Sequence, residues 1–169
     1  MIVISDSGPL RYLVLIEEKH FLPPLFGAIV IPSYVAAELT QKNTPSTVRL
    51  WMEQPPEWAK IASSHSPLAH ISSALDLGER EAIALAEEIS ADLLLVDDGA
   101  ARREATRREL PVMGTLGILD LAAEHGHADF SAAARKLMQT NFRASGKLIQ
   151  FFLERDALRK QRFGKEQTP

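Results

Sequence analysis

The stretch LLLVDDGAARR, residues 93–103, joins four large aliphatic residues directly to two adjacent aspartates, followed by small residues and arginines. Its first half is typical of a short buried strand. Its second half is typical of a helix start, because Asp is a favoured N-cap residue and suits the positive end of the helix dipole. Capping accounts for one aspartate, and there are two. The stretch therefore predicts a strand, a turn and a helix, with one carboxylate left to explain.

The same order of strand, turn and helix recurs at three other places. Residues 2–4 are β-branched and lead to a Gly-Pro pair, and proline fits the first turn of a helix. The run AIVIP at 28–32 leads into SYVAAELT, and a short strand near 111–113 leads into a helix that ends around Gly126. Short, non-alternating strands separated by helices indicate a mainly parallel α/β sheet covered on both faces.

The remaining segments are predicted to be helical, within one domain of residues 1–169. Residues 45–88 form a helical region interrupted by PPEW and HSPLAH. NFRASGKLIQFFLERDALRKQRFG contains an amphipathic helix at about 146–162, followed by a frayed tail, KEQTP. Four apolar side chains are expected on the buried side of that last helix: Leu148, Ile149, Phe152 and Leu153.

Composition excludes several kinds of site. The chain has 169 residues, no cysteine and a net charge of −3, so disulfides and thiolate zinc sites are excluded and nucleic-acid binding needs local basic patches. The N-terminus reaches Asp6 without a basic segment, unlike a signal peptide, and no window approaches the roughly 20 apolar residues that cross a bilayer. We therefore expect a cytoplasmic protein that does not bind a membrane.

Two groups of aspartates are expected at the same edge of the sheet. Asp6 follows the first predicted strand, and Asp97 and Asp98 follow the strand at 93–96. Ligands of open parallel sheets bind outside the carboxyl ends of the strands. The sequence therefore predicts that these carboxylates share a site, with Asp97 preferred as ligand and Asp98 as helix cap.

Two glutamates are further candidates for that site. Glu79 shares the apolar stripe of its helix, whereas Glu81 falls among charged residues and is expected in solvent. The alternative for Glu79 is a capping box with Asp76, in the D-x-x-E spacing that closes a helix start. Glu38 lies in the middle of a predicted helix, and only the other carboxylates make it a candidate for the site.

A site that gathers four of these carboxylates needs a cation. Two carboxylates about 4 Å apart repel by roughly 4 kcal/mol at an effective dielectric constant near 20, so the fold tolerates them only if they are protonated or neutralised. All-oxygen ligation suits Mg²⁺ or Mn²⁺. Water bound to such an ion can attack a phosphodiester, so the residues themselves point to metal-assisted phosphodiester hydrolysis.

The order of these motifs resembles that of the PIN domain. The motifs are DSGPL after the first strand, P-x-x-V-x-x-E-L, LGEREAIALA, and VDDGAAR followed by PVMGTLGIL. The chain is similar to a bacterial PIN-like subfamily close to the VapC-type toxins of toxin–antitoxin systems, and NFRAS extends the likeness over essentially the whole chain. The resemblance implies a three-layer α/β/α sandwich with a central, mainly parallel sheet of four to five strands.

The resemblance also implies an endoribonuclease that depends on Mg²⁺ or Mn²⁺, forms a homodimer and is held inactive by a small antitoxin. Its catalytic carboxylates correspond here to Asp6, Glu38, Glu79, Asp97 and Asp98. All of them except Glu38 are the expected metal ligands.

Substrate contacts are expected from Ser7 and Arg102. Ser7 matches the hydroxyl residue after the first family carboxylate, and Arg102 stands close to the acidic residues at a helix N-terminus, where phosphate is attracted. Arg107 and Arg108 are instead expected to pair with acidic residues on a solvated face. A second basic group is expected in solvent: Arg155, Arg159, Lys160, Arg162 and Lys165.

Two alternatives remain open from the sequence. Gly8 stands where related sequences carry Ser, and Val96 where they carry Thr. With the acidic net charge, these departures fit a PIN-like RNA-binding or protein-binding module with weak or lost catalysis. A purely structural subunit is the third hypothesis, and it predicts that Asp6, Glu38 and Glu79 lie far apart.

Overall fold

A parallel five-stranded sheet forms the centre of the computed structural model, which describes residues 1–166 and their side chains up to Arg162. Its strands are β1 (Val3–Ser5), β2 (Ile29–Pro32), β3 (Ala59–Ala62), β4 (Leu93–Leu95) and β5 (Val112–Met113). They lie in the order β3-β2-β1-β4-β5, and every neighbouring pair is parallel. The predicted α/β sandwich with four to five mainly parallel strands is thus confirmed.

The strand order changes direction at β1. The chain first builds β2 and β3 on one side of β1 and then returns to place β4 and β5 on the other side, with Ile4 paired to Leu94. The backbone N–H of Asp6 donates to the carbonyl of Leu95 over 2.9 Å, so the end of β1 lies directly beside the end of β4. In open parallel sheets a binding crevice forms at this kind of switch point.

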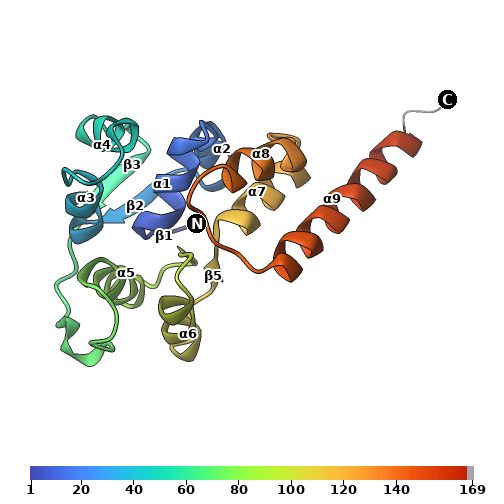
Figure 1. The fold of residues 1–169 in the computed structure, drawn as a ribbon. Helices are drawn as coiled ribbons and strands as arrows, with labels where there is room; N and C mark the ends of the chain where they lie inside the picture. The colour runs from blue at the N-terminus through green and yellow to red at the C-terminus, as the bar shows by residue number, and fades with distance from the viewer. Residues whose placement is uncertain (167–169) are drawn as a thin grey trace. The chain divides into compact units, whose positions relative to one another are not determined.

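Residues 1–115 form the first of two compact units, which contains all five strands of the sheet. Its helices are α1 (Ser7–Leu15), η1 (Lys19–Phe21), α2 (Leu22–Phe26), α3 (Ser33–Leu39), α4 (Ser46–Glu53), η2 (Leu68–His70), α5 (Leu77–Glu88) and α6 (Gly99–Arg107). In Figure 1, α1 and α2 lie on the opposite side of the strands from α5 and α6. Helix α5 packs on β1, β2 and β4, burying Ile83 with Ile4 and Leu94 in one apolar cluster.

Strand β3 corrects the prediction of a helical region at 45–88. That region contains α4, the strand and the short η2 before α5 begins. Two consecutive prolines follow α4, and β3 pairs with β2 as an edge strand whose Lys60 and Ile61 are exposed. Four residues at an exposed edge are too few and too polar to show the apolar pattern of a strand. Pairing with β2 therefore decides their conformation.

The second unit, described from Leu116 to Glu166, is helical. Its helices are α7 (Thr115–Glu124), α8 (Phe130–Met138) and α9 (Gly146–Glu166). The first residue of α7, Thr115, is also the last residue of the first unit. Helix α9 is longer than predicted and includes the first two residues of the expected frayed tail; 167–169 lie outside the described residues. The single-domain assignment stays a prediction. No helix among the described residues has the length and apolar composition needed to span a membrane.

Helix α9 also corrects two predictions about its side chains. Leu148 and Leu153, expected to be buried, are 45% and 37% exposed, whereas Arg159, expected in solvent, is 4% exposed. Arg159 pairs with Asp120 and with the buried Asp156. Buried charges of opposite sign are tolerated because each satisfies the other. Of the four predicted apolar side chains, Ile149 and Phe152 are half-buried, and Phe152 packs on the buried Phe130.

The other four basic residues that were expected in solvent also lie on α9. Lys160 contacts Asp156 and Asp129, and Arg155 contacts Asp120. Arg162 is exposed as expected, and the side chain of Lys165 lies outside the described residues.

Candidate active site

Asp6 is the central carboxylate of the candidate site. It follows β1 at the N-terminus of α1 but forms no side-chain capping bond, and only 5% of it is exposed. Its Oδ1 atom is buried without a hydrogen-bond partner among the described residues. The pKa of this carboxyl is raised from 3.8 to about 7, chiefly by burial and also by the negative charges of Glu79, Glu38 and Asp76, while one backbone hydrogen bond from Ser7 lowers it.

Glu38 reaches the same cleft from α3. The Ser7 hydroxyl donates to Glu38 Oε1 over 3.0 Å. Burial raises the pKa of Glu38, while this hydrogen bond lowers it. Ser7, which the sequence assigned to substrate contact, therefore orients a carboxylate in this structure.

Glu79 forms the predicted capping box and also lies close to other carboxylates. Its backbone N–H donates to Asp76 Oδ1 over 2.8 Å, and its Oε2 accepts from the Asp76 N–H over 3.0 Å, so the capping box is formed. Burial raises the pKa of Glu79, and the charges of Asp76, Asp98 and Glu38 raise it further. Asp76 thus belongs to the carboxylate cluster, although the sequence suggested for it only a cap; the D-x-x-E spacing was the available signal.

Asp97 is held by Thr115, a residue that the sequence analysis did not single out. Thr115 donates its backbone N–H to Asp97 Oδ1 over 2.8 Å and its hydroxyl to Oδ2 over 2.6 Å. Burial raises the pKa of Asp97, and these hydrogen bonds lower it. The hydroxyl expected at position 96 is thus replaced by that of Thr115, which β5 brings beside the end of β4.

Two glycines allow Asp97 to approach its neighbours. A Cβ at Gly114 would lie 2.8 Å from Asp97 Oδ1, closer than real Cβ contacts. A Cβ at Gly8 would lie 3.3 Å from Asp97 Oδ2, a tight contact. Packing therefore explains the glycine at position 8, because its lack of a side chain lets the start of α1 lie close to Asp97.

Asp98 is the helix cap, as preferred from the sequence. Its side chain accepts from the N–H groups of Ala100 and Ala101 over 2.7 and 3.0 Å. It is exposed, and its charge also raises the pKa of Glu79. The role of Asp97 as a metal ligand stays a prediction.

Glu81 corrects a prediction, because it is only 3% exposed rather than solvated. It accepts from the Ser33 hydroxyl over 2.8 Å and from the Tyr34 N–H over 2.6 Å. Both donors belong to the first turn of α3. Packing of α3 on α5 thus buries a carboxylate that the helical pattern of α5 alone placed outside.

The donor set fits a hard cation in its chemistry. Asp6 offers a buried oxygen that lacks a partner, and a buried polar atom without one costs free energy that an ion can recover. No group of three or more His, Asp and Glu side chains in the described part of the chain is arranged so that it could hold a metal ion. Mg²⁺ retains several waters and typically binds through only one or two protein carboxylates, so its requirement is smaller than such a group.

The cluster also bears on the hypothesis of a purely structural subunit. Glu38 and Glu79 lie close enough to Asp6 for both charges to raise its pKa, and Glu38 also raises the pKa of Glu79. The simplest form of that hypothesis, which separates them widely, is therefore excluded.

A basic groove of about 520 Å³ runs along α6 beside the acidic residues. Its lining residues are Gly99, Arg102, Arg103, Thr106, Arg107 and Val112. Arg102 Nη1 donates to the Val96 carbonyl over 3.0 Å, which fixes part of its guanidinium. The exposed Arg103 makes neither a hydrogen bond nor an ion pair with the described residues.

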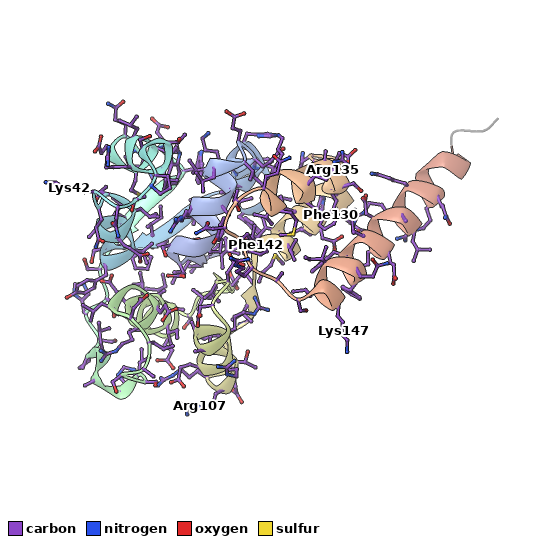
Figure 2. The ribbon with its side chains drawn as sticks, viewed as in Figure 1. Lys42, Arg107, Phe130, Arg135, Phe142 and Lys147 are labelled. Atoms are coloured by element: carbon purple, nitrogen blue, oxygen red, sulfur yellow. The ribbon has the colours of Figure 1, made fainter. Side chains whose placement is uncertain are left out.

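The other two arginines of this segment are paired, as predicted. Arg107 and Arg108 both contact Glu104 over 2.7 Å, and Arg108 also contacts Glu87. Figure 2 shows Arg107 at the outer side of α6, pointing away from the strands.

Comparison with known families gives one result. A family described as a PIN domain matches residues 2–157, which is most of the chain. None of the curated proteins matches it significantly.

Proposed function

Because this chain belongs to the PIN-domain family and so has a nuclease-type fold, we propose that it is a metal-dependent endoribonuclease that hydrolyses RNA phosphodiesters in the acidic cleft. The observation that carries the proposal is the buried, unpartnered Asp6 oxygen with Glu38, Asp76 and Glu79 close to it. Such a group of carboxylates destabilises the fold unless a proton or a cation joins it. A cation-binding function explains why the chain retains the cluster.

The carboxylates divide into different roles in this proposal. Asp6, Glu79 and Asp97 would hold Mg²⁺ or Mn²⁺, and Asp98, which caps α6, would add its negative charge beside the ion. The bound ion supplies an activated water and neutralises charge on the phosphoryl oxygens. Glu38 accepts a proton from water, because its raised pKa brings it closer to neutral pH.

The groove on α6 is the proposed path of the RNA backbone. Arg102 lies at the acidic end of this groove, and Arg103 offers a guanidinium without a protein partner. Phosphate binding by arginine releases counterions, so binding should weaken steeply with salt. The negative net charge of the chain does not oppose this, because local cations govern the contact.

The test combines metal binding with RNA cleavage. Mn²⁺ titrated into the purified protein should raise the thermal unfolding midpoint and support cleavage of single-stranded RNA, and Asp6→Asn should remove both effects. Glu57→Gln, at an exposed position outside the cluster, is the matched control. A protein that Mn²⁺ does not stabilise, and whose RNA cleavage survives Asp6→Asn, would refute the proposal.

A PIN-like RNA-binding or protein-binding module with weak or lost catalysis is the second candidate. It is favoured by the hydrogen bonds from Thr115 to both oxygens of Asp97 and by the lack of a three-residue metal group among residues 1–166. It predicts RNA binding that persists in EDTA, with no cleavage at any Mn²⁺ concentration.

The cellular role extends the proposal further. By its resemblance to VapC-type toxins, the protein acts in the cytoplasm as the toxin of a pair, with a small antitoxin and a second copy of itself as partners. Exposed apolar side chains on α9 support a protein contact there: Leu148, Phe151, Leu153 and Leu158. Sedimentation velocity of the protein and of Phe151→Ser tests the dimer, because a monomer at all concentrations contradicts it.

A further inference from the structure

A second hollow, of about 490 Å³, lies between α3 and α5 and shares Glu38 with the acidic cleft. Its lining residues are Tyr34, Ala37, Glu38, Gln41, Leu75, Asp76, Leu77 and Gly78. Tyr34 is 47% exposed and Leu77 49%, so both side chains are accessible to a ligand in the hollow. The hollow therefore combines an aromatic and an apolar wall with two carboxylates.

The walls of this hollow are held by buried contacts. Glu81 accepts from the Ser33 hydroxyl and the Tyr34 N–H, so the first turn of α3 is tied to α5. A Cβ at Gly78 would lie 3.4 Å from both Glu38 Oε2 and Asp76 Oδ1. The two carboxylates thus meet over a glycine, with no side chain between them.

The chemistry of the walls selects an occupant. Carboxylates repel phosphate but accept N–H groups, as Asp and Glu do from the amino group of cytosine. An exposed aromatic ring offers a stacking surface to any base of a single-stranded RNA. A volume of this order also accommodates a small ligand.

We propose that this hollow binds one unstacked base of the RNA, with its face on Tyr34 and an amino-bearing edge toward Glu38 or Asp76. The inference rests on the proposed ribonuclease function and adds a specificity to it. Adenine, cytosine and guanine carry an amino group with two N–H donors for these carboxylates. Uracil offers only its single ring N3–H and binds more weakly. Cleavage should therefore favour sites with an amino-bearing base at one fixed position relative to the bond.

The test uses nucleosides, which contain no phosphate and cannot be cleaved. Binding of adenosine, cytidine and uridine to the full chain in EDTA is measured by NMR chemical-shift titration. We expect adenosine and cytidine to bind several-fold more tightly than uridine. Tyr34→Ala should weaken their binding roughly ten-fold, the scale of one lost base–aromatic stack, and Tyr34→Phe should retain it. Leu50→Ala, 62% exposed on α4, is the surface control.

Each outcome decides the inference separately from the ribonuclease proposal. Loss of the adenosine and cytidine preference in Tyr34→Ala, but not in Tyr34→Phe, supports the base pocket even if no RNA is cleaved. Absence of nucleoside binding, or binding that Tyr34→Ala leaves unchanged, overturns it even if RNA is cleaved with Mn²⁺. Binding of N-acetylarginine amide without any nucleoside also overturns it, in favour of a protein partner.

Discussion

Replacing Asp6 by Asn should stabilise the metal-free protein at neutral pH. The ordinary carboxyl pKa of 3.8 rises to about 7 in the fold, chiefly by burial. The folded state therefore binds the Asp6 proton more tightly than the unfolded chain does, and the stability that this gives is complete below pH 3.8 and is lost as the pH rises to 7. The two values differ by about three, and each pKa unit corresponds to about 1.4 kcal/mol, so ionised Asp6 lowers the free energy of unfolding by about 4 kcal/mol.

Urea unfolding in EDTA at several pH values between 4 and 8 measures this effect. Asp6→Asn should flatten the fall in the free energy of unfolding over that range, and Glu57→Gln, an exposed carboxyl, should leave the fall in place. Mn²⁺ should act in the opposite direction, because it binds the ionised form and displaces the proton. Its stabilisation of the unaltered protein should therefore increase from pH 5 to pH 8.

Two results would refute the reasoning. One is a free energy of unfolding that is flat with pH in the unaltered protein, which would mean that Asp6 ionises without penalty. The other is Asp6→Asn being less stable than the unaltered protein at pH 7 in EDTA, which would mean that the carboxylate has a stabilising partner in the fold.

Three further predictions concern residues around the cleft. Glu81→Ala should lower the free energy of unfolding in urea by about 1 to 3 kcal/mol, because it leaves the half-buried Ser33 and Tyr34 donors without their acceptor. An effect below about 0.5 kcal/mol would contradict the burial of this carboxylate. Asp98→Ala should lower the free energy of unfolding by about 1 kcal/mol, because the N-cap of α6 is lost, and it should change Mn²⁺ affinity little. Asp97→Asn should weaken Mn²⁺ binding measured by calorimetry. The reverse pattern would mean that Asp98 is the ligand and Asp97 is not. Arg103→Ala should weaken RNA binding and reduce its salt dependence by about one phosphate contact, and Arg107→Ala, whose guanidinium is paired with Glu104, is the control that should change RNA binding less.

Most strands could be predicted because their neighbours in sequence already define them. β1, β2 and β4 lie inside the sheet, so their residues are apolar on both faces and form short continuous runs. β3 lies at the edge, where Lys60 and Ile61 are exposed, and its four residues carry no comparable pattern. The start of α9 was predicted, but its C-terminal end and its buried ion pairs were missed, because an amphipathic pattern does not reveal which face finds a partner.

The sequence by itself determined that carboxylates follow β1 and β4, because a parallel sheet delivers the ends of its strands to one edge. It also contained the capping box of Asp76 and Glu79, a contact between residues three apart. Only the tertiary structure decided that Thr115 holds Asp97, that Glu81 is buried and that Asp6 keeps an oxygen without a partner. The first two outcomes depend on how β5 lies beside β4 and how α3 packs on α5, and contacts between segments distant in sequence leave no periodic signal in either one.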